Sequence, residues 1–289
     1  MKLSTWMVSL AALAVFAACG GGGGSAASTT ASGTSTSTGG GTVLTQGRHT
    51  TDQPDDVAGA QVHVMYVVPS GASDRQLDLG DTLINSIASY NNWLATQTGG
   101  RKLRYDTLNG RLDITYVSLP RSDAQYQSFG ARQRDTIEAD LQAAGLLAAG
   151  KIYSVYYEGG SPNACADAPR PPDLPGQVNV MYLHGLAGVA GVTPCDQNQF
   201  AASASAPAGY LDLSMMHEIV HTLGGVSDGA PNQVLSGHVN TSPTDLMYAG
   251  PLPWQPSVLD VNKSNYYNPA GLPAGIFNLA NSDFLLPAP

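Results

Sequence analysis

The spacing of apolar side chains changes along the chain, and each spacing predicts a type of secondary structure. Residues 62–68 form a short apolar run that is rich in β-branched side chains and ends at Pro69, which predicts a buried strand. Residues 112–119 alternate apolar with polar side chains and predict a half-exposed strand. Two further apolar runs, at 152–157 and 178–183, predict additional strands.

Three segments have the longer apolar period of a helix. Residues 79–98 repeat apolar side chains near helical spacing, and Gly99 and Gly100 predict the end of that helix. Residues 132–147 predict a second helix, and residues 211–223 are apolar nearly all round, as expected of a buried one. Strands interleaved with helices predict one domain of mixed α/β architecture.

The N-terminal part of the chain does not follow these patterns. In residues 1–18, Lys2 precedes an apolar run of about a dozen residues, which is too short for a bilayer span but suits an export signal. Small residues directly before Cys19 resemble the lipobox of bacterial lipoproteins, which implies acylation of that thiol and an exported, membrane-anchored chain. Ordinary cleavage and secretion is the alternative. Residues 19–56 are mostly Gly, Ser, Thr and Ala with a polar, acidic end, and predict a flexible linker before a folded domain at 57–289.

Charge and cysteine content restrict the class of protein further. The net charge is −9, from 13 basic and 22 acidic residues, which argues against a nucleic-acid-binding protein. With Cys19 assigned to lipid, Cys165 and Cys195 remain, and export to an oxidising compartment predicts a disulfide between them. There is no C-x-x-C pair that would indicate a cysteine-based zinc site.

The candidate chemistry lies in the predicted buried helix. His217, Glu218 and His221 form an H-E-x-x-H motif, and helical spacing places both histidines on one face, where they can bind one Zn²⁺. Glu218 is adjacent and is suited to take a proton from a water molecule. The alternative is a pair of core histidines beside a structural glutamate, but a glutamate is costly in so apolar a helix unless it has a function.

The residues after this motif resemble those of the metzincin clan of zinc metalloproteases. That clan has H-E-x-x-H-x-x-G-x-x-H or -D followed by a Met-containing turn. Gly224 matches the glycine, and Met247 matches the Met-turn. The third-ligand position holds Ser227, so the third ligand is either Asp228, one residue later, or His238, after an inserted loop. We favour His238, because imidazole is a common zinc donor.

The resemblance implies a metzincin-like mixed β-sheet, an active-site helix, a Met-turn and an irregular C-terminal subdomain. It also implies a zinc-dependent endopeptidase with Glu218 as general base and a protein or peptide substrate extended along an edge strand, for which 178–183 is the candidate. We further expect a monomer. A zinc-containing cell-surface binding module and a zinc hydrolase of non-peptide substrates are the alternatives. We expect His184 to be a core or loop histidine and Tyr248 to be a packed aromatic residue, and we assign no role to His49 or His63.

Overall fold

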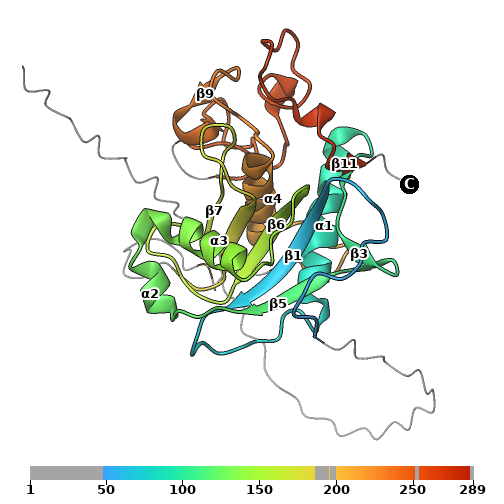
Figure 1. Cartoon of the computed structure of the whole chain (residues 1–289). Helices are drawn as coiled ribbons and strands as arrows, with labels where there is room; N and C mark the ends of the chain where they lie inside the picture. Colours follow the sequence, from blue (N-terminus) through green and yellow to red (C-terminus); the bar gives the residue numbers. More distant parts are fainter. Residues whose placement is uncertain (1–47, 186–194, 196–199, 251–253, 287–289) are drawn as a thin grey trace, which may run out of the picture.

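The computed structural model describes residues 48–185, 195, 200–250 and 254–286 (Figure 1). The predicted signal peptide at 1–18, Cys19 and most of the predicted linker lie outside the described residues. Within the described part of the chain, no helix has the length and apolar character needed to cross a bilayer.

A five-stranded sheet forms the centre of the fold (Figure 1). Its strands follow the order β5 (Ile114–Ser118), β1 (Gln61–Val68), β6 (Lys151–Tyr157), β8 (Val178–Tyr182) and β7 (Ala166–Asp167). The first four are parallel to one another, and β7 pairs antiparallel with β8 at one edge. Parallel strands need long crossover connections: helices lie in those from β1 to β5 and from β5 to β6, whereas the one from β6 to β8 contains β7.

Helices cover both faces of the sheet. The helices α1 (Asp81–Thr98) and α4 (Tyr210–Thr222) share one core cluster, whereas α2 (Asp123–Gln127) and α3 (Gln133–Ala143) contribute to the cluster on the other face. Figure 1 shows α3 in front of the sheet with α1 and α4 on its far side. The mixed α/β architecture predicted from the sequence is therefore confirmed.

The strand β1 shows why two helical layers are needed. All of its residues are buried, and successive side chains of a strand point to opposite faces. Val64 and Tyr66 belong to the cluster that includes α1 and α4, whereas Met65 and Val67 belong to the cluster that includes α2 and α3. A strand of this kind reads as a continuous apolar run rather than an alternating one.

The edge of the sheet differs from the sequence-based expectation. The run at 178–183 is present as β8 but lies inside the sheet, because β7 pairs with its outer side through Ala166 and Asp167. Two residues are too few to give a recognisable strand pattern. The predicted disulfide is confirmed: Cys165 and Cys195 are bonded, with their Cα atoms 5.6 Å apart, and Cys165 directly precedes β7.

Irregular structure follows α4. From residue 223 onward, the described chain forms two-residue strands and 3₁₀ turns rather than further long elements. The remaining strands are, in chain order, β2 (Lys102–Leu103), β3 (Thr107–Leu108), β4 (Arg111–Leu112), β9 (Gln233–Val234), β10 (His238–Val239) and β11 (Leu285–Leu286).

Residues 48–56 contact the folded domain, although composition predicts that they are linker. The backbone of His49 bridges to Thr115 of β5. Asp52 and Asp55 accept hydrogen bonds from the ammonium group of Lys151, at 2.7 and 2.6 Å. The segment is therefore in part attached to the domain: the carboxylates of Asp52 and Asp55 meet a buried lysine that is 99 residues away from Asp52 in the sequence, whereas Asp56 is exposed.

Candidate metal centre

The helix α4 is buried along almost its whole length, from Leu211 to Thr222. Its first turn is held by the buried Asp212, whose carboxylate accepts hydrogen bonds from the backbone N–H of Gly209 and from the hydroxyl of Ser86. The helix ends at Thr222, and two residues later Gly224 has a φ of 97°, a conformation that favours glycine and turns the chain away. These contacts fix the position of the H-E-x-x-H residues in the interior.

Three imidazole rings converge beside this helix. The Nε2 atom of His238 lies 3.2 Å from Nε2 of His217 and 3.2 Å from Nε2 of His221. We call these three residues the histidine cluster; each of them offers one ring nitrogen within 4.8 Å of the other two. Zn–N bonds of about 2.0–2.1 Å at tetrahedral angles place two donor nitrogens about 3.3 Å apart, so the observed spacing fits one tetrahedral ion.

The protonation of the rings agrees with a metal site. Nδ1 of His217 donates to the carbonyl oxygen of Leu246 at 2.7 Å, so in the neutral ring Nε2 keeps its lone pair. Nδ1 of His238 lies 3.3 Å from the carbonyl oxygen of Leu235, which favours the same tautomer. Burial, together with the nearby His238, lowers the pKa of His217 to about 3, which keeps its ring neutral. Neutral lone pairs that face one another at this distance repel unless a cation lies between them.

His238, rather than Asp228, joins the two histidines of α4. The preceding Gly237 has a φ of 75°, and a Cβ atom there would lie 3.2 Å from Cε1 of His221, so glycine suits both the turn and the close approach. Asp228 is exposed and accepts a hydrogen bond from the side chain of Gln233 at 2.9 Å. The geometry therefore supports the choice of His238 as the third candidate ligand.

The turn that contains Met247 positions two of the three rings. It supplies the Leu246 carbonyl that orients His217, and the carbonyl of Met247 accepts from the backbone N–H of Val239, directly after His238. The Met247 side chain is fully buried in the core cluster that includes α4. Hydrogen bonds to a backbone carbonyl commonly orient metal-binding histidines, so this turn acts as their support.

Asp245 holds that turn in place, and sequence reasoning assigned it no role. Its buried carboxylate accepts from the backbone N–H groups of Met247 and Val261, each at 2.9 Å, and from the hydroxyl of Tyr266 at 3.0 Å. The residue directly precedes Leu246. An aspartate two residues before Met247 is visible in the sequence, but its burial and its partners, which also include the Asn265 amide at 3.3 Å, are visible only in the structure.

Glu218 and His217 reach a cleft with a volume of about 40 Å³, which is room for more than one water molecule. Burial, followed by the nearby Asp167 carboxylate, raises the pKa of Glu218 well above its usual range. Trp254 packs edge-on against His217, with ring centroids 5.8 Å apart. The described residues that line the cleft are Ala164, Cys165, Ala166, Tyr210, Ser214, His217, Glu218 and Trp254.

The walls of this cleft come from segments that sequence analysis did not connect with the motif. Cys165 and Ala166 belong to the disulfide and to β7, so the disulfide ties one wall of the cleft to residue 195. Tyr210 and Trp254 pack edge-on against each other, with centroids 5.4 Å apart, on another wall. No motif marks these aromatic residues, since they become neighbours only through the tertiary fold.

Two residues set aside in the sequence have their own environments. Nε2 of His184 lies 2.7 Å from the buried carboxylate of Glu158, which also contacts Tyr66 and Arg75, so His184 belongs to a separate polar network. Tyr248 is buried, with 6% of its surface exposed. Neither residue is part of the histidine cluster.

Comparison with known proteins adds little to this description. No family model matches the chain, and no curated protein matches it. One solved structure, described as "Structure of a chaperone-substrate complex", aligns with a TM-score of 0.31 and 16% sequence identity. The alignment covers 61% of this chain and 26% of that chain. A likeness at this level supports no conclusion about fold or function.

Proposed function

We propose that the protein is a zinc-dependent endopeptidase in which His217, His221 and His238 bind Zn²⁺ and Glu218 acts as general base. The observation that carries the proposal is the convergence of ring nitrogens at 3.2 Å beside a cleft that also contains Glu218. Three neutral imidazoles leave a fourth position for water or substrate, as in catalytic zinc sites.

Each residue of the site has a distinct task in this proposal. A bound Zn²⁺ supplies Lewis-acid chemistry, which polarises a carbonyl group and activates water at neutral pH. The carboxylate of Glu218 accepts the proton of the attacking water and then delivers it to the nitrogen of the leaving amine. The Leu246 carbonyl keeps His217 in the tautomer whose Nε2 lone pair faces the cluster. Trp254 and Tyr210 form an apolar wall that limits access of bulk water.

The assignment to peptide bonds rests on the resemblance to metzincins. His217, Glu218, His221, Gly224 and Met247 match the clan pattern, and the turn at Met247 supports the histidines as a Met-turn would. The resemblance to a lipobox at Cys19 supports the further proposal that the enzyme is an exported lipoprotein anchored at a membrane.

Cleavage assays test the proposal directly. The purified full-length chain should cleave casein and a peptide library, and a zinc chelator should abolish that cleavage. Glu218→Gln should retain zinc while it loses turnover, because the amide cannot take up the proton. Absence of chelator-sensitive cleavage by a zinc-loaded wild type would refute the peptidase assignment and leave a binding module or a hydrolase of non-peptide substrates.

A further inference from the structure

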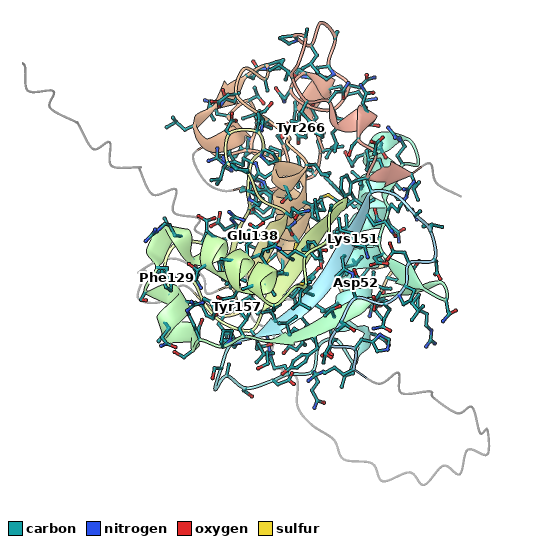
Figure 2. The ribbon with its side chains drawn as sticks, viewed as in Figure 1. Asp52, Phe129, Glu138, Lys151, Tyr157 and Tyr266 are labelled. Carbon is teal, nitrogen blue, oxygen red and sulfur yellow. A yellow bond between two sulfur atoms is a disulfide. The ribbon has the colours of Figure 1, made fainter. Side chains whose placement is uncertain are left out.

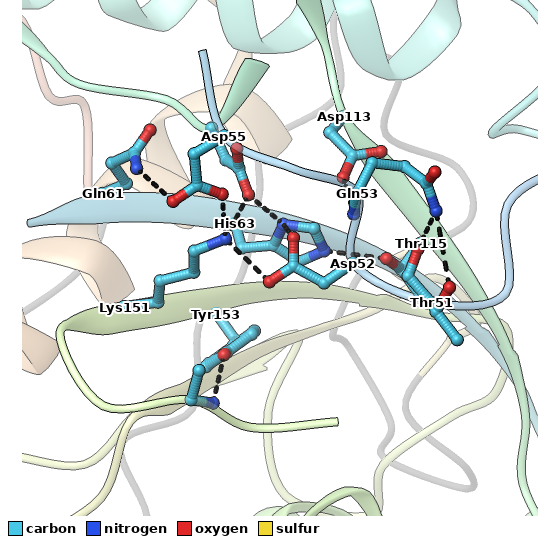
Figure 3. A network of polar contacts seen from close by, with 12 residues as sticks. Thr51, Asp52, Gln53, Asp55, Gln61, His63, Asp113, Thr115, Lys151 and Tyr153 are labelled. Atoms are coloured by element: carbon cyan, nitrogen blue, oxygen red, sulfur yellow. Dashed lines mark hydrogen bonds and ion pairs between the residues drawn. The ribbon is translucent and has the colours of Figure 1, made fainter. Parts of the chain in front are cut away.

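A second group of metal-ligating side chains lies on a different part of the sheet. Asp52, His63, Asp106 and Asp113 each offer a ligand atom, and these atoms lie within 4.8 Å of one another. We call this group the carboxylate cluster. His63 alternates with Val62 and Val64 on β1, so its side chain points to the sheet face opposite α4. Figure 2 shows Asp52 and Lys151 on this side of the molecule, and Figure 3 shows the network from close by.

A lysine inside the cluster neutralises only part of its charge. Nζ of Lys151 donates to Asp52 Oδ2 at 2.7 Å, to Asp55 Oδ1 at 2.6 Å and to Asp106 Oδ2 at 2.6 Å. An ammonium group has three protons, so these contacts use its full donor capacity. Three carboxylates share this ammonium group, so it has no donor left for their remaining oxygens or for Asp113.

His63 is also fully engaged. Its Nδ1 lies 2.7 Å from Asp106 Oδ2, and its Nε2 lies 2.8 Å from the hydroxyl oxygen of Thr115. A carboxylate oxygen accepts, so Nδ1 carries the proton in that contact. The histidine therefore orients Asp106, and the donors that remain for a cation are carboxylate oxygens.

Three buried oxygens in the cluster lack hydrogen-bond partners. They are the Oδ1 atoms of Asp52, Asp106 and Asp113. Asp106 is 0% exposed and Asp113 is 2% exposed, and Asp113 Oδ1 lies 3.5 Å from Nδ1 of His49. A buried carboxylate oxygen without a partner is costly, and metal coordination is one of the few ways to compensate it.

We propose that Asp52, Asp106 and Asp113 bind a Ca²⁺ ion that clasps residues 48–56 onto the sheet. Ca²⁺ prefers oxygen ligands at about 2.3–2.6 Å, so oxygens that share one ion lie up to about 5 Å apart, which fits the spacing of this cluster. The side chain of Asp52 is 28% exposed, which allows water to complete the coordination. Asp52 lies in the segment 48–56, whereas Asp106 directly precedes β3 and Asp113 directly precedes β5. One ion therefore joins that segment to the sheet.

Calorimetric titration of Ca²⁺ into the zinc-loaded full-length chain tests this site. Zinc saturation keeps the histidine cluster out of the titration. We expect one Ca²⁺ per chain with a Kd of about 10⁻⁵ to 10⁻³ M, a range seen in sensor and extracellular calcium sites. Ca²⁺ at a hundredfold excess over Kd should raise Tm by about 5–10 °C.

Substitutions assign the binding to these residues. Asp52→Asn and Asp113→Asn should each weaken Ca²⁺ binding at least tenfold, whereas Asp81→Asn, an exposed acid at the start of α1, should bind like the wild type. If Asp113→Asn does not fold, Asp52→Asn decides, because Asp52 lies on a partly exposed segment. The proposal fails if the wild type shows no saturable binding, or if Asp52→Asn binds Ca²⁺ as tightly as the wild type.

Discussion

The histidine cluster beside α4 and the carboxylate cluster beside β1 both gather ligand atoms in the interior, but they differ in charge. Each histidine ring is neutral when it carries a single N–H proton, on Nδ1, and the cluster adjoins a cleft. The carboxylates are anionic, and the ammonium group of Lys151 donates hydrogen bonds to Asp52 and Asp106. Neutral imidazoles can be buried without a counter-charge, so the histidine cluster can exist with or without a bound metal ion. Buried carboxylates need a compensating positive charge whether or not a metal ion is bound.

The difference separates a chemical role from a structural one. In the histidine cluster, the supporting contacts run from Nδ1 of His217 to the Leu246 carbonyl and from Nδ1 of His238 to the Leu235 carbonyl, and they orient lone pairs toward one point. In the carboxylate cluster, the contacts join a terminal segment to the sheet (Figure 3). A substitution in the histidine cluster should lower activity with little loss of stability. A substitution in the carboxylate cluster should lower stability with little loss of activity.

The largest effect should come from removing a ring of the histidine cluster. His217→Ala deletes one of the three proposed zinc donors, so we expect loss of bound zinc and a fall in kcat/KM for peptide cleavage of at least about 10³-fold. Zinc content and cleavage rate measure the effect, and Tm reports on the fold. Unchanged cleavage in His217→Ala would contradict the assignment of the chemical role to the histidine cluster.

Glu218→Gln should separate metal binding from proton transfer. The amide keeps the size of the side chain but cannot accept a proton, so kcat should fall by about 10²–10⁴-fold. Zinc content should stay at the wild-type value, because Glu218 is not one of the proposed ligands. A variant that turns over at the wild-type rate would show that another group takes the proton.

Lys151→Met should act on stability rather than on zinc. The change leaves Asp52, Asp55 and Asp106 without their shared ammonium, so the free energy of unfolding should fall by about 3–5 kcal/mol. Lys102→Met is a matched control, because Lys102 contacts the side chain of Asn92 at an exposed position. Denaturant unfolding of the three chains measures the effect, and an equal fall in both variants would contradict it.

The smallest effect should be a pH dependence at Asp245. Burial raises the pKa of Asp245 to about 6, and the neighbouring Asp260 carboxylate contributes in the same direction, while the Tyr266 hydroxyl donates to it. The folded chain then binds this proton more tightly than the unfolded chain does, so Asp245 adds stability as the pH falls from about 6 toward 4.

Asp245→Asn removes that contribution. Relative to the wild type, the variant should lose on the order of 2 kcal/mol of unfolding free energy between pH 7 and pH 4. Parallel unfolding curves at the two pH values measure the difference. Identical pH dependence in both chains would show that Asp245 keeps its charge throughout this range.

Local patterns account for what the sequence could predict. The run that became β1 and the motif on α4 are continuous in sequence, so periodicity and spacing were enough to find them. His238 remained one of two alternatives, because its approach to His221 depends on the conformation of the intervening loop and of Gly237. The strand β7 was missed because two residues carry no periodicity.

The carboxylate cluster could not have been predicted in this way. Asp52 and Lys151 are 99 residues apart, and His63 and Asp106 are 43 residues apart, so only the tertiary fold brings them together. The composition of residues 48–56 suggested a solvated linker for the same reason. The sequence alone does not show that the carboxylates of this segment contact Lys151.

Zinc stoichiometry in matched variants tests the central claim most directly. Wild type, His238→Ala and Asp228→Ala are purified as full-length chains, and zinc per chain and peptide cleavage are measured on the same samples. The histidine cluster predicts one zinc and full cleavage in the wild type and in Asp228→Ala, with loss of both in His238→Ala. Full zinc retention in His238→Ala, or a wild type that binds no zinc, would contradict it.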